Sequence, residues 1–328
     1  MEHFQVYDPA FHTLTGDAPQ LELLLEKDYP FAHEAGVFIP EKNELFITSN
    51  QLVDGDGRRR VQITKIIIGQ DGTAQSEEIS CPSVEMANGG VNYDQDKWLV
   101  CAQGSHSGPP GGLYFVDINP PYKTELVVAD FHGRPFNSVN DVVVHSDGSI
   151  WFTDPCYGFG GGFKPRPRLP NQVYRYDPTS RGIRAVADGF GRPNGICFSP
   201  DEKTVYVTDT DWIQTLDNID DTRASTIYAF DVQQYAGQPF LTNRRLFAFC
   251  ETGIPDGIKC DMDGNVYSGC GDGVHVWSAG GVLLGKIRVA GGVANFCFGR
   301  RGEMFLLNET KVWRARLGGA VRGALLKI

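Results

Sequence analysis

Residues 136–158 read FNSVNDVVVHSDGSIWFTDPCYG, and the fold prediction begins with this segment. Two short apolar runs, DVVVH and SIWFT, flank Ser146-Asp147-Gly148. Apolar runs on both sides of an Asp-Gly turn are the strongest short-range signal for a β-hairpin. The hairpin begins with two amides, Asn137 and Asn140, and ends at Asp154. Polar oxygens are therefore expected at one end of an otherwise apolar unit, which is where we look first for function.

Five relatives of this hairpin occur along the chain, each with a first residue, an apolar run, a turn and a second run rich in Val, Phe, Tyr or Trp. They are EAGVFIPEKNELFITSN from Glu34, NGGVNYDQDKWLVCAQG from Asn88, NGICFSPDEKTVYVTDT from Asn194, DGIKCDMDGNVYSGCG from Asp256 and ANFCFGRRGEMFLLNE from Ala294. Successive repeats start 38 to 62 residues apart. The longest step contains a polar insertion at residues 213–225, which we expect to form an exposed loop.

Further short strands lie between the hairpins, as in GLYFVDI at residues 112–118, so each repeat holds three or four strands. Helical patterns are scarce, and the best candidate, LELLLE at residues 21–26, could equally be a strand. Repeats of this kind are typical of propeller blades. We therefore predict an all-β fold, a six-bladed β-propeller, as a single domain over residues 1–328 in which residues 1–27 close or cap the ring. A β-sandwich is the rival fold, but it does not explain six matched hairpins.

The composition of the chain argues against some classes of function and location. The formal net charge of −10 argues against nucleic-acid binding, which clustered Lys and Arg would supply. The chain as given shows neither a secretory signal nor an apolar stretch long enough to span a membrane, and no obligate protein partner is evident. Its eight cysteines form no CxxC metal pairs and several lie in apolar runs, so we expect buried free thiols and a cytoplasmic location.

Ring geometry predicts which residues meet. The first strand of every blade lines the central channel of a propeller, and its opening residue is the repeated polar position. Five such residues are expected at one mouth of the channel: Glu34, Asn88, Asn140, Asn194 and Asp256. The loops after the second strands are expected to bring further residues to the rim, namely Asn50, His106, Asp154, Tyr157, Asp209 and Asp211. Ala294 contributes no oxygen.

Carboxylates and amide oxygens that share one point favour Ca²⁺, Mg²⁺ or Mn²⁺ over thiolate-bound zinc. Asn or Asp before Gly can also simply form strand-entry turns. Glu34 has no such turn role, and its register with the other polar residues favours the metal interpretation.

These residues resemble the regucalcin (senescence marker protein) and gluconolactonase family of six-bladed propellers. The likeness covers essentially the whole chain, and NSVNDVVVHSDGSIWFTDPCYG is similar to the family's NSPNDVVVxSDGxIxFTDPPYG. HEAG around Glu34, RPNGICFSPDEKTVYVTDT at Asn194 and PDGIKCDMDGNVY at Asp256 are further matches. The resemblance implies that Glu34, Asn194 and Asp256 are ligands of one divalent cation, usually Ca²⁺, with Mg²⁺, Mn²⁺ or Zn²⁺ accepted.

The resemblance also implies hydrolysis of a lactone. Asp256 would position or deprotonate the attacking water, and Asn140 would contact that water or the substrate, so both are the expected catalytic residues. Substrate contacts are expected from Asn88, Asn137, Asn140, His106, Tyr157 and Asp209. The chain departs from the family pattern at Ala35-Gly36, Val139 and Cys156, which changes the rim and not the ligands.

Other hypotheses remain open at this point. The same scaffold could hydrolyse phosphotriesters at a calcium site, bind metal or a protein without catalysis, or act as a metal-independent condensing enzyme. Four of the residues could also have no direct role in function. His106 could be an exposed loop histidine, Asp209 could end a strand, and Tyr157 and Cys156 could be packing groups.

Overall fold

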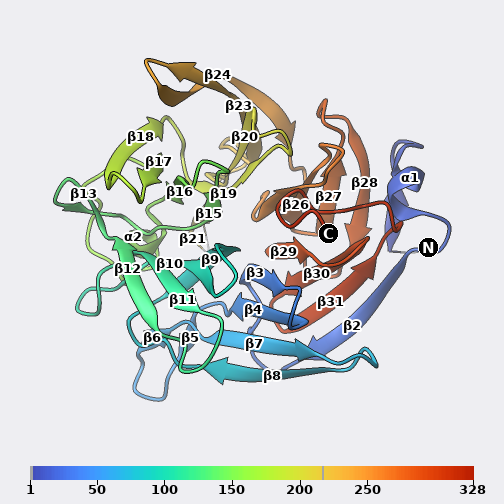
Figure 1. Cartoon of the computed structure of the whole chain (residues 1–328), viewed down its shortest axis with the longest axis horizontal. Helices are drawn as coiled ribbons and strands as arrows, with labels where there is room; N and C mark the ends of the chain where they lie inside the picture. Colours follow the sequence, from blue (N-terminus) through green and yellow to red (C-terminus); the bar gives the residue numbers. More distant parts are fainter. Residues whose placement is uncertain (1–2, 216–217) are drawn as a thin grey trace.

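The computed structural model describes residues 3–215 and 218–328. Six antiparallel sheets, one for each repeat, surround a common axis, which confirms the predicted six-bladed β-propeller (Figure 1). The innermost strands contact one another in order around the ring, and the last of them contacts the first. Among the described residues, no helix has the length and hydropathy needed to cross a membrane.

The first three sheets run from the innermost to the outermost strand in sequence order. The first contains β3 (Glu34–Ile39), β4 (Glu44–Thr48), β7 (Ile63–Ile68) and β8 (Ala74–Ile79). The second contains β9 (Ala87–Asn92), β10 (Lys97–Ala102), β11 (Gly112–Asp117) and β12 (Thr124–Val128). The third contains β15 (Val142–Val144), β16 (Ile150–Asp154), β17 (Gln172–Asp177) and β18 (Gly182–Ala187).

The last three sheets follow the same order. The fourth contains β19 (Pro193–Phe198), β20 (Thr204–Asp209), β23 (Thr226–Tyr235) and β24 (Gln238–Phe249). The fifth contains β25 (Ile258–Cys260), β26 (Val266–Cys270), β27 (Gly273–Trp277) and β28 (Leu283–Arg288). The sixth contains β29 (Asn295–Phe298), β30 (Glu303–Asn308) and β31 (Lys311–Arg316).

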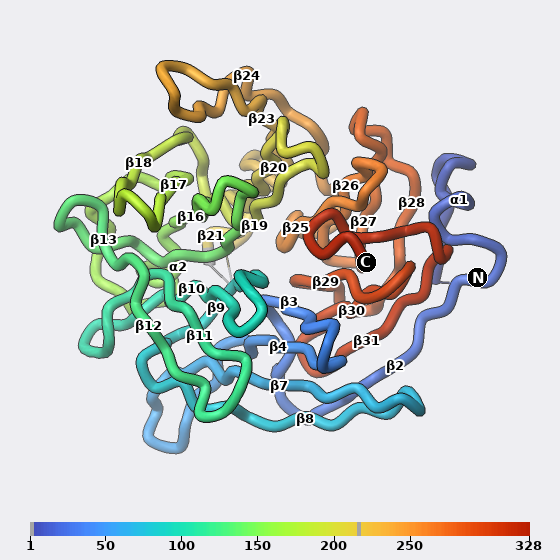
Figure 2. Tube along the Cα trace, in the orientation of Figure 1, coloured from blue at the N-terminus to red at the C-terminus, as the bar shows by residue number. Residues whose placement is uncertain are grey.

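The N-terminal segment supplies strands to two of these sheets. β2 (Gln20–Glu26) pairs with β31 and becomes the outermost strand of the sixth sheet, so residues 21–26 form a strand and not a helix. β1 (Phe4–Val6) pairs with β28 as a fifth strand of the fifth sheet. The helix α1 (Phe11–Thr15) connects β1 to β2 in the sequence. Figure 2 shows the blue N-terminal trace running along the red C-terminal strands.

Some of the loops between strands contain short elements of their own. Three two-stranded hairpins are β5 (Leu52–Val53) with β6 (Arg59–Arg60), β13 (Asp130–Phe131) with β14 (Arg134–Pro135), and β21 (Ile213–Thr215) with β22 (Asn218–Ile219). The insertion at residues 213–225, expected as a loop, therefore contains a small hairpin, and its residues 216–217 lie outside the described part of the chain. A single helical turn, α2 (Tyr157–Gly160), follows β16.

The hydrophobic core is divided into six clusters, one at each interface between neighbouring sheets. Side chains alternate between the two faces of a strand, so each sheet packs against both neighbours. In β4, for example, Phe46 packs toward the second sheet while Leu45 and Ile47 pack toward the sixth. The alternation of large apolar residues in the second strand of each repeat therefore follows directly from the ring.

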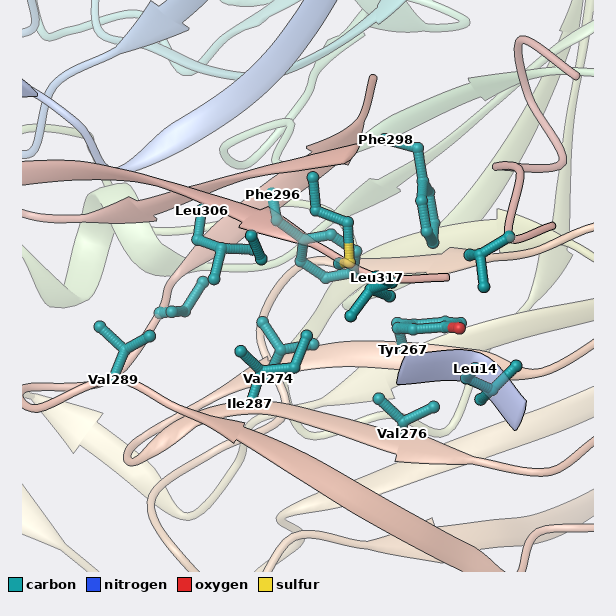
Figure 3. Packing of buried hydrophobic residues seen from close by; sticks show 14 of the residues in the cluster. Leu14, Tyr267, Val274, Val276, Ile287, Val289, Phe296, Phe298, Leu306 and Leu317 are labelled. Atoms are coloured by element: carbon teal, nitrogen blue, oxygen red, sulfur yellow. The ribbon is translucent and has the colours of Figure 1, made fainter. Parts of the chain in front are cut away.

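The interface between the fifth and sixth sheets illustrates this packing (Figure 3). Val274 and Ile287 from the fifth sheet face Phe296 and Leu306 from the sixth, and Leu14 of α1 covers the edge of the cluster. The N-terminal segment thus contributes apolar side chains as well as strands where the chain ends meet.

Candidate active site at the mouth of the channel

One cavity of about 580 Å³ lies at the end of the channel where the innermost strands begin, and we call it the channel-mouth cavity. All five predicted polar residues line it: Glu34, Asn88, Asn140, Asn194 and Asp256. Its other lining residues include Asn50 and Tyr157, which were expected at the rim. The structure thus brings together side chains from five different sheets.

β-Bulges direct several of these side chains. The pairing register shifts in β3 beside Ala35, in β9 beside Asn88 and in β19 beside Asn194. A bulge leaves a residue unpaired and changes the direction of the side chains beside it, and bulges are common next to active sites. In β3 the bulge includes Gly36, whose φ of +85° favours glycine.

The glycines that follow Asn88, Asn194 and Asp256 allow neighbouring sheets to approach closely. A Cβ atom on Gly89 would lie 2.5 Å from the backbone oxygen of Asn140, and one on Gly195 would lie 2.5 Å from that of Asp256. The Asn-Gly and Asp-Gly pairs are therefore explained by ring packing. The side chains of Asn88, Asn194 and Asp256 line the cavity.

Glu34 and Asp256 form the charged centre of the cavity together with His33. The nitrogen and carboxylate oxygens of these three residues lie within 4.8 Å of one another. His33 Nδ1 also bonds Glu309 Oε1 at 2.6 Å, and Asn295 Nδ2 donates to Glu34 Oε2 at 2.7 Å. Asn295 of the sixth sheet therefore holds Glu34 in place, and Glu309, directly after β30, holds His33.

Burial and like charge shift the titration of both acids. Burial, followed by the charge of Asp256, raises the pKa of Glu34 to about 8. Burial raises the pKa of Asp256 to about 6, although His33 and the amide of Asn194 oppose that rise. Burial alone would lower the pKa of His33, but Glu309 and the two cavity acids outweigh it and raise that pKa to about 10.

Two buried oxygens in the cavity have no partner within the described residues. Asn140 Oδ1 and Asp256 Oδ1 accept no hydrogen bond, whereas buried polar atoms are normally paired. Asn194 donates its Nδ2 to the hydroxyl of Tyr157 at 3.3 Å, which leaves its carbonyl oxygen available. Two carboxylates and free amide oxygens in one cavity are the donor set that hard divalent cations prefer, so the residues fit such an ion.

Three predicted substrate-binding residues do not line the channel-mouth cavity. Asp209 accepts hydrogen bonds from the backbone of Gly191 and Arg192, so its carboxylate holds the chain ahead of β19. Asn137 donates its side-chain amide to the backbone oxygens of Leu169 and Pro170. The structure therefore gives both of these residues structural hydrogen bonds in place of the expected substrate contacts.

His106 also differs from expectation, because its side chain is exposed in the loop after β10 and lies outside the cavity lining. Asp154 and Asp211 were expected at the rim. Asp154 accepts hydrogen bonds from the backbone of Asn137 and Ser138, and Asp211 pairs with Arg223 at 2.8 Å. Local polar groups therefore satisfy three of the six loop residues that were expected at the rim, namely Asp154, Asp209 and Asp211.

Other cavity residues were missed by the sequence analysis. His33, Gln103, Arg59 and Arg192 line the cavity. Asn295 supports Glu34 from the sixth repeat, one residue after the position where no oxygen was expected. The only sequence signal for His33 and Asn295 is their position next to a repeat start.

Comparisons with known proteins show what the whole chain is similar to. A family model described as SMP-30/gluconolactonase/LRE-like region matches residues 61–307. Lactonohydrolase oryL of Aspergillus oryzae is 30% identical over 327 residues, which cover 94% of this chain and 73% of that protein. A gluconolactonase of Zymomonas mobilis is 28% identical over 235 residues, which cover 66% of this chain and 63% of that protein. The structure of a gluconolactonase from Xanthomonas campestris superimposes with a TM-score of 0.75 at 27% identity, covering 97% of this chain and 95% of that one.

Proposed function

The chain belongs to the SMP-30/gluconolactonase/LRE-like family, and we propose that it hydrolyses the ring ester of a small lactone in the channel-mouth cavity. The observation that supports this most is the set of unpartnered buried oxygens on Asn140 and Asp256 beside the carboxylate of Glu34. The relatives named as lactonohydrolase and gluconolactonase support the reaction class.

In this proposal Glu34, Asn194 and Asp256 hold one divalent cation, Ca²⁺ before Mg²⁺, Mn²⁺ or Zn²⁺. When bound, such an ion polarises an ester carbonyl and lowers the pKa of a coordinated water. The hydrogen bonds that orient two of these three side chains support this role. Asn295 orients Glu34, and Tyr157 orients the amide of Asn194.

The protein's own groups supply the remaining steps. Asp256 Oδ1 is unpartnered and buried, so it can accept the proton of an attacking water. Asn140 Oδ1 faces the same cavity and can accept a hydrogen bond that orients the water or a hydroxyl of the substrate. Asn88 donates its side-chain amide to the backbone oxygen of Asn140 at 3.1 Å, so it positions that residue.

Two arginines point to the class of lactone. Arg59 and Arg192 line the cavity, and neither is in an ion pair with a described carboxylate, whereas Arg58 and Arg60 both are. The guanidinium of Arg192 lies 5.6 Å from the ring centre of Tyr157. An unpaired guanidinium at the wall of an otherwise acidic site favours a substrate with a carboxylate or phosphate substituent.

Replacing Arg192 by glutamine is expected to raise KM about 10-fold or more for a lactone that carries a carboxylate, because a hydrogen bond to a charged group contributes about 1.5–3 kcal/mol. The KM for a neutral lactone of the same ring size should stay within about twofold of wild type, since no charged contact is lost. Steady-state kinetics on the matched lactone pair measure this. Arg166→Gln, at an exposed position outside the cavity, is the control. Equal effects on both lactones would contradict the anionic-substrate assignment.

The acid pKa values also predict how metal binding depends on pH. In the metal-free protein, Glu34 with a pKa of about 8 and Asp256 with a pKa of about 6 bind protons that the unfolded chain has released. The stability of the metal-free fold therefore falls as pH rises from the ordinary carboxyl range toward pH 8. Metal binding must displace these protons, so metal affinity rises over the same range.

The increase in melting temperature caused by saturating Ca²⁺ is accordingly expected to be larger at pH 8 than at pH 6, because the ion binds only the folded state. Thermal unfolding with Ca²⁺ and with chelator at the two pH values measures this difference. An increment that is constant, or that grows toward acid pH, would show that the two acids do not hold the ion.

A substrate panel tests the reaction class. Sugar, aliphatic and aromatic lactones followed with a pH indicator should be turned over, and turnover should stop on chelation and return with added metal. Preference for paraoxon-like esters would support the phosphotriesterase alternative. Full activity after exhaustive chelation would favour a metal-independent enzyme, and the absence of turnover on the whole panel would leave a binding protein.

A further inference from the structure

A second group of metal-ligating side chains lies between the fourth and fifth sheets, apart from the residues that line the channel-mouth cavity. Cys250 follows β24, Cys270 ends β26 and His275 lies within β27. The two sulfur atoms and a ring nitrogen lie within 4.8 Å of one another. The residues are 1%, 2% and 0% exposed, so the three atoms meet in a dry site.

The hydrogen bonds of His275 leave one nitrogen without a partner. Its Nε2 bonds Asp272 Oδ1 at 2.5 Å, whereas its buried Nδ1 has no hydrogen-bond partner among the described residues. A metal-bound histidine commonly donates its other nitrogen to a carboxylate, which fixes the tautomer and directs the lone pair to the metal. Asp272 is itself held by Lys286 at 3.2 Å and Arg288 at 2.8 Å, so this support is rigid.

Two cysteines of this group lie beside the unpartnered nitrogen of His275, and cysteine binds metals as the thiolate. The other close pair, Cys197 and Cys260, has its sulfur atoms 3.7 Å apart but is not part of any described group of three metal-ligating residues.

We propose that Cys250, Cys270 and His275 bind a thiophilic divalent ion, Zn²⁺ foremost, as a site separate from the oxygen ligands of the cavity. In a tetrahedral zinc site, ligand atoms lie about 3.6–3.8 Å from one another, so atoms already within 4.8 Å need to move only slightly. The Glu251 Oε2 atom, 3.8 Å from His275 Nδ1, is within reach as a fourth ligand. This proposal does not depend on the reaction that the protein catalyses.

The position of this group gives the ion a structural role. Cys250 begins the connection from the fourth sheet to Asp256, and Ile254 in that connection lines the channel-mouth cavity. The backbone oxygen of Thr252 accepts a hydrogen bond from Gly271, directly after Cys270. An ion held by Cys250 and the fifth sheet would therefore fix the connection that leads to Asp256.

Titration of the reduced, metal-free full-length protein with Co²⁺ tests the proposal. Thiolate ligands give Co²⁺ a charge-transfer band in the near ultraviolet, whereas the all-oxygen ligands of the cavity do not. We expect that band to saturate at about one equivalent and to disappear when Zn²⁺ displaces Co²⁺. Zn²⁺ should also raise the melting temperature in the presence of excess Ca²⁺.

Variants assign the band to these residues. Cys250→Ser and Cys270→Ser should each lose it, while Cys197→Ser, a buried cysteine of the other pair, should keep it. X-ray absorption at the zinc edge of the wild-type protein gives a readout that does not depend on folded variants, and two sulfur ligands are expected. Absence of a thiolate band in the wild type, a band that survives Cys270→Ser, or a zinc shell without sulfur would overturn the proposal.

Discussion

Replacing Asp256 by alanine is expected to lower kcat/KM for lactone hydrolysis by at least about 10²–10⁴-fold, the range that a positioned general base contributes on its own. The loss should be larger because the same carboxylate is also a proposed ligand of the cation. Asp256→Asn keeps the shape of the side chain and removes its charge, so it should retain the fold and lose nearly as much activity. The pH-indicator assay on the best lactone of the panel measures both variants.

A matched control separates this effect from a general loss of surface charge. Asp263 is an exposed aspartate in the turn between β25 and β26 of the same sheet, away from the cavity. Asp263→Asn should therefore keep wild-type kinetics. Wild-type turnover by Asp256→Ala would remove this residue from the mechanism.

Glu34→Gln is expected to weaken Ca²⁺ binding by more than about 100-fold without destabilising the metal-free fold. Replacement of a group that only supports a ligand commonly costs 10–100-fold, and Glu34 is proposed as a ligand itself. The metal-free fold is spared because burial and Asp256 already disfavour the charged form of Glu34. Calorimetric titration measures the affinity, and thermal unfolding in chelator measures the stability.

Asn295→Ala provides the graded comparison, because Asn295 donates to Glu34 Oε2 and has no proposed contact with the ion. Its affinity for Ca²⁺ should fall by about 10–100-fold, between wild type and Glu34→Gln. An unchanged affinity in Glu34→Gln would refute the proposed ligand set.

The fold could be predicted from the sequence because a propeller repeats one hairpin, and repetition makes a weak local signal strong. The convergence of Glu34, Asn194 and Asp256 on one cavity followed from the same symmetry, since equal positions in each repeat face the same axis. Family resemblance added the expected roles of these residues. Spacing alone indicated only where their side chains meet.

The loop residues were harder to predict because a polar side chain near a strand end has two possible partners. Asp209 and Asn137 bind nearby backbone groups, an arrangement that their residue types allow as readily as contact with substrate. His33 and Asn295 were missed because each lies one residue from a repeat position. The group of Cys250, Cys270 and His275 has no metal-type spacing in the sequence, and only the packing of two sheets brings it together.

Anomalous diffraction from crystals soaked in Mn²⁺ locates the proposed cation without reference to activity. We expect an anomalous peak in the channel-mouth cavity, with oxygens of Glu34, Asn194 and Asp256 within about 2.0–2.6 Å of it. A cavity without a peak, or a peak that these three side chains do not share, would refute the proposed metal site.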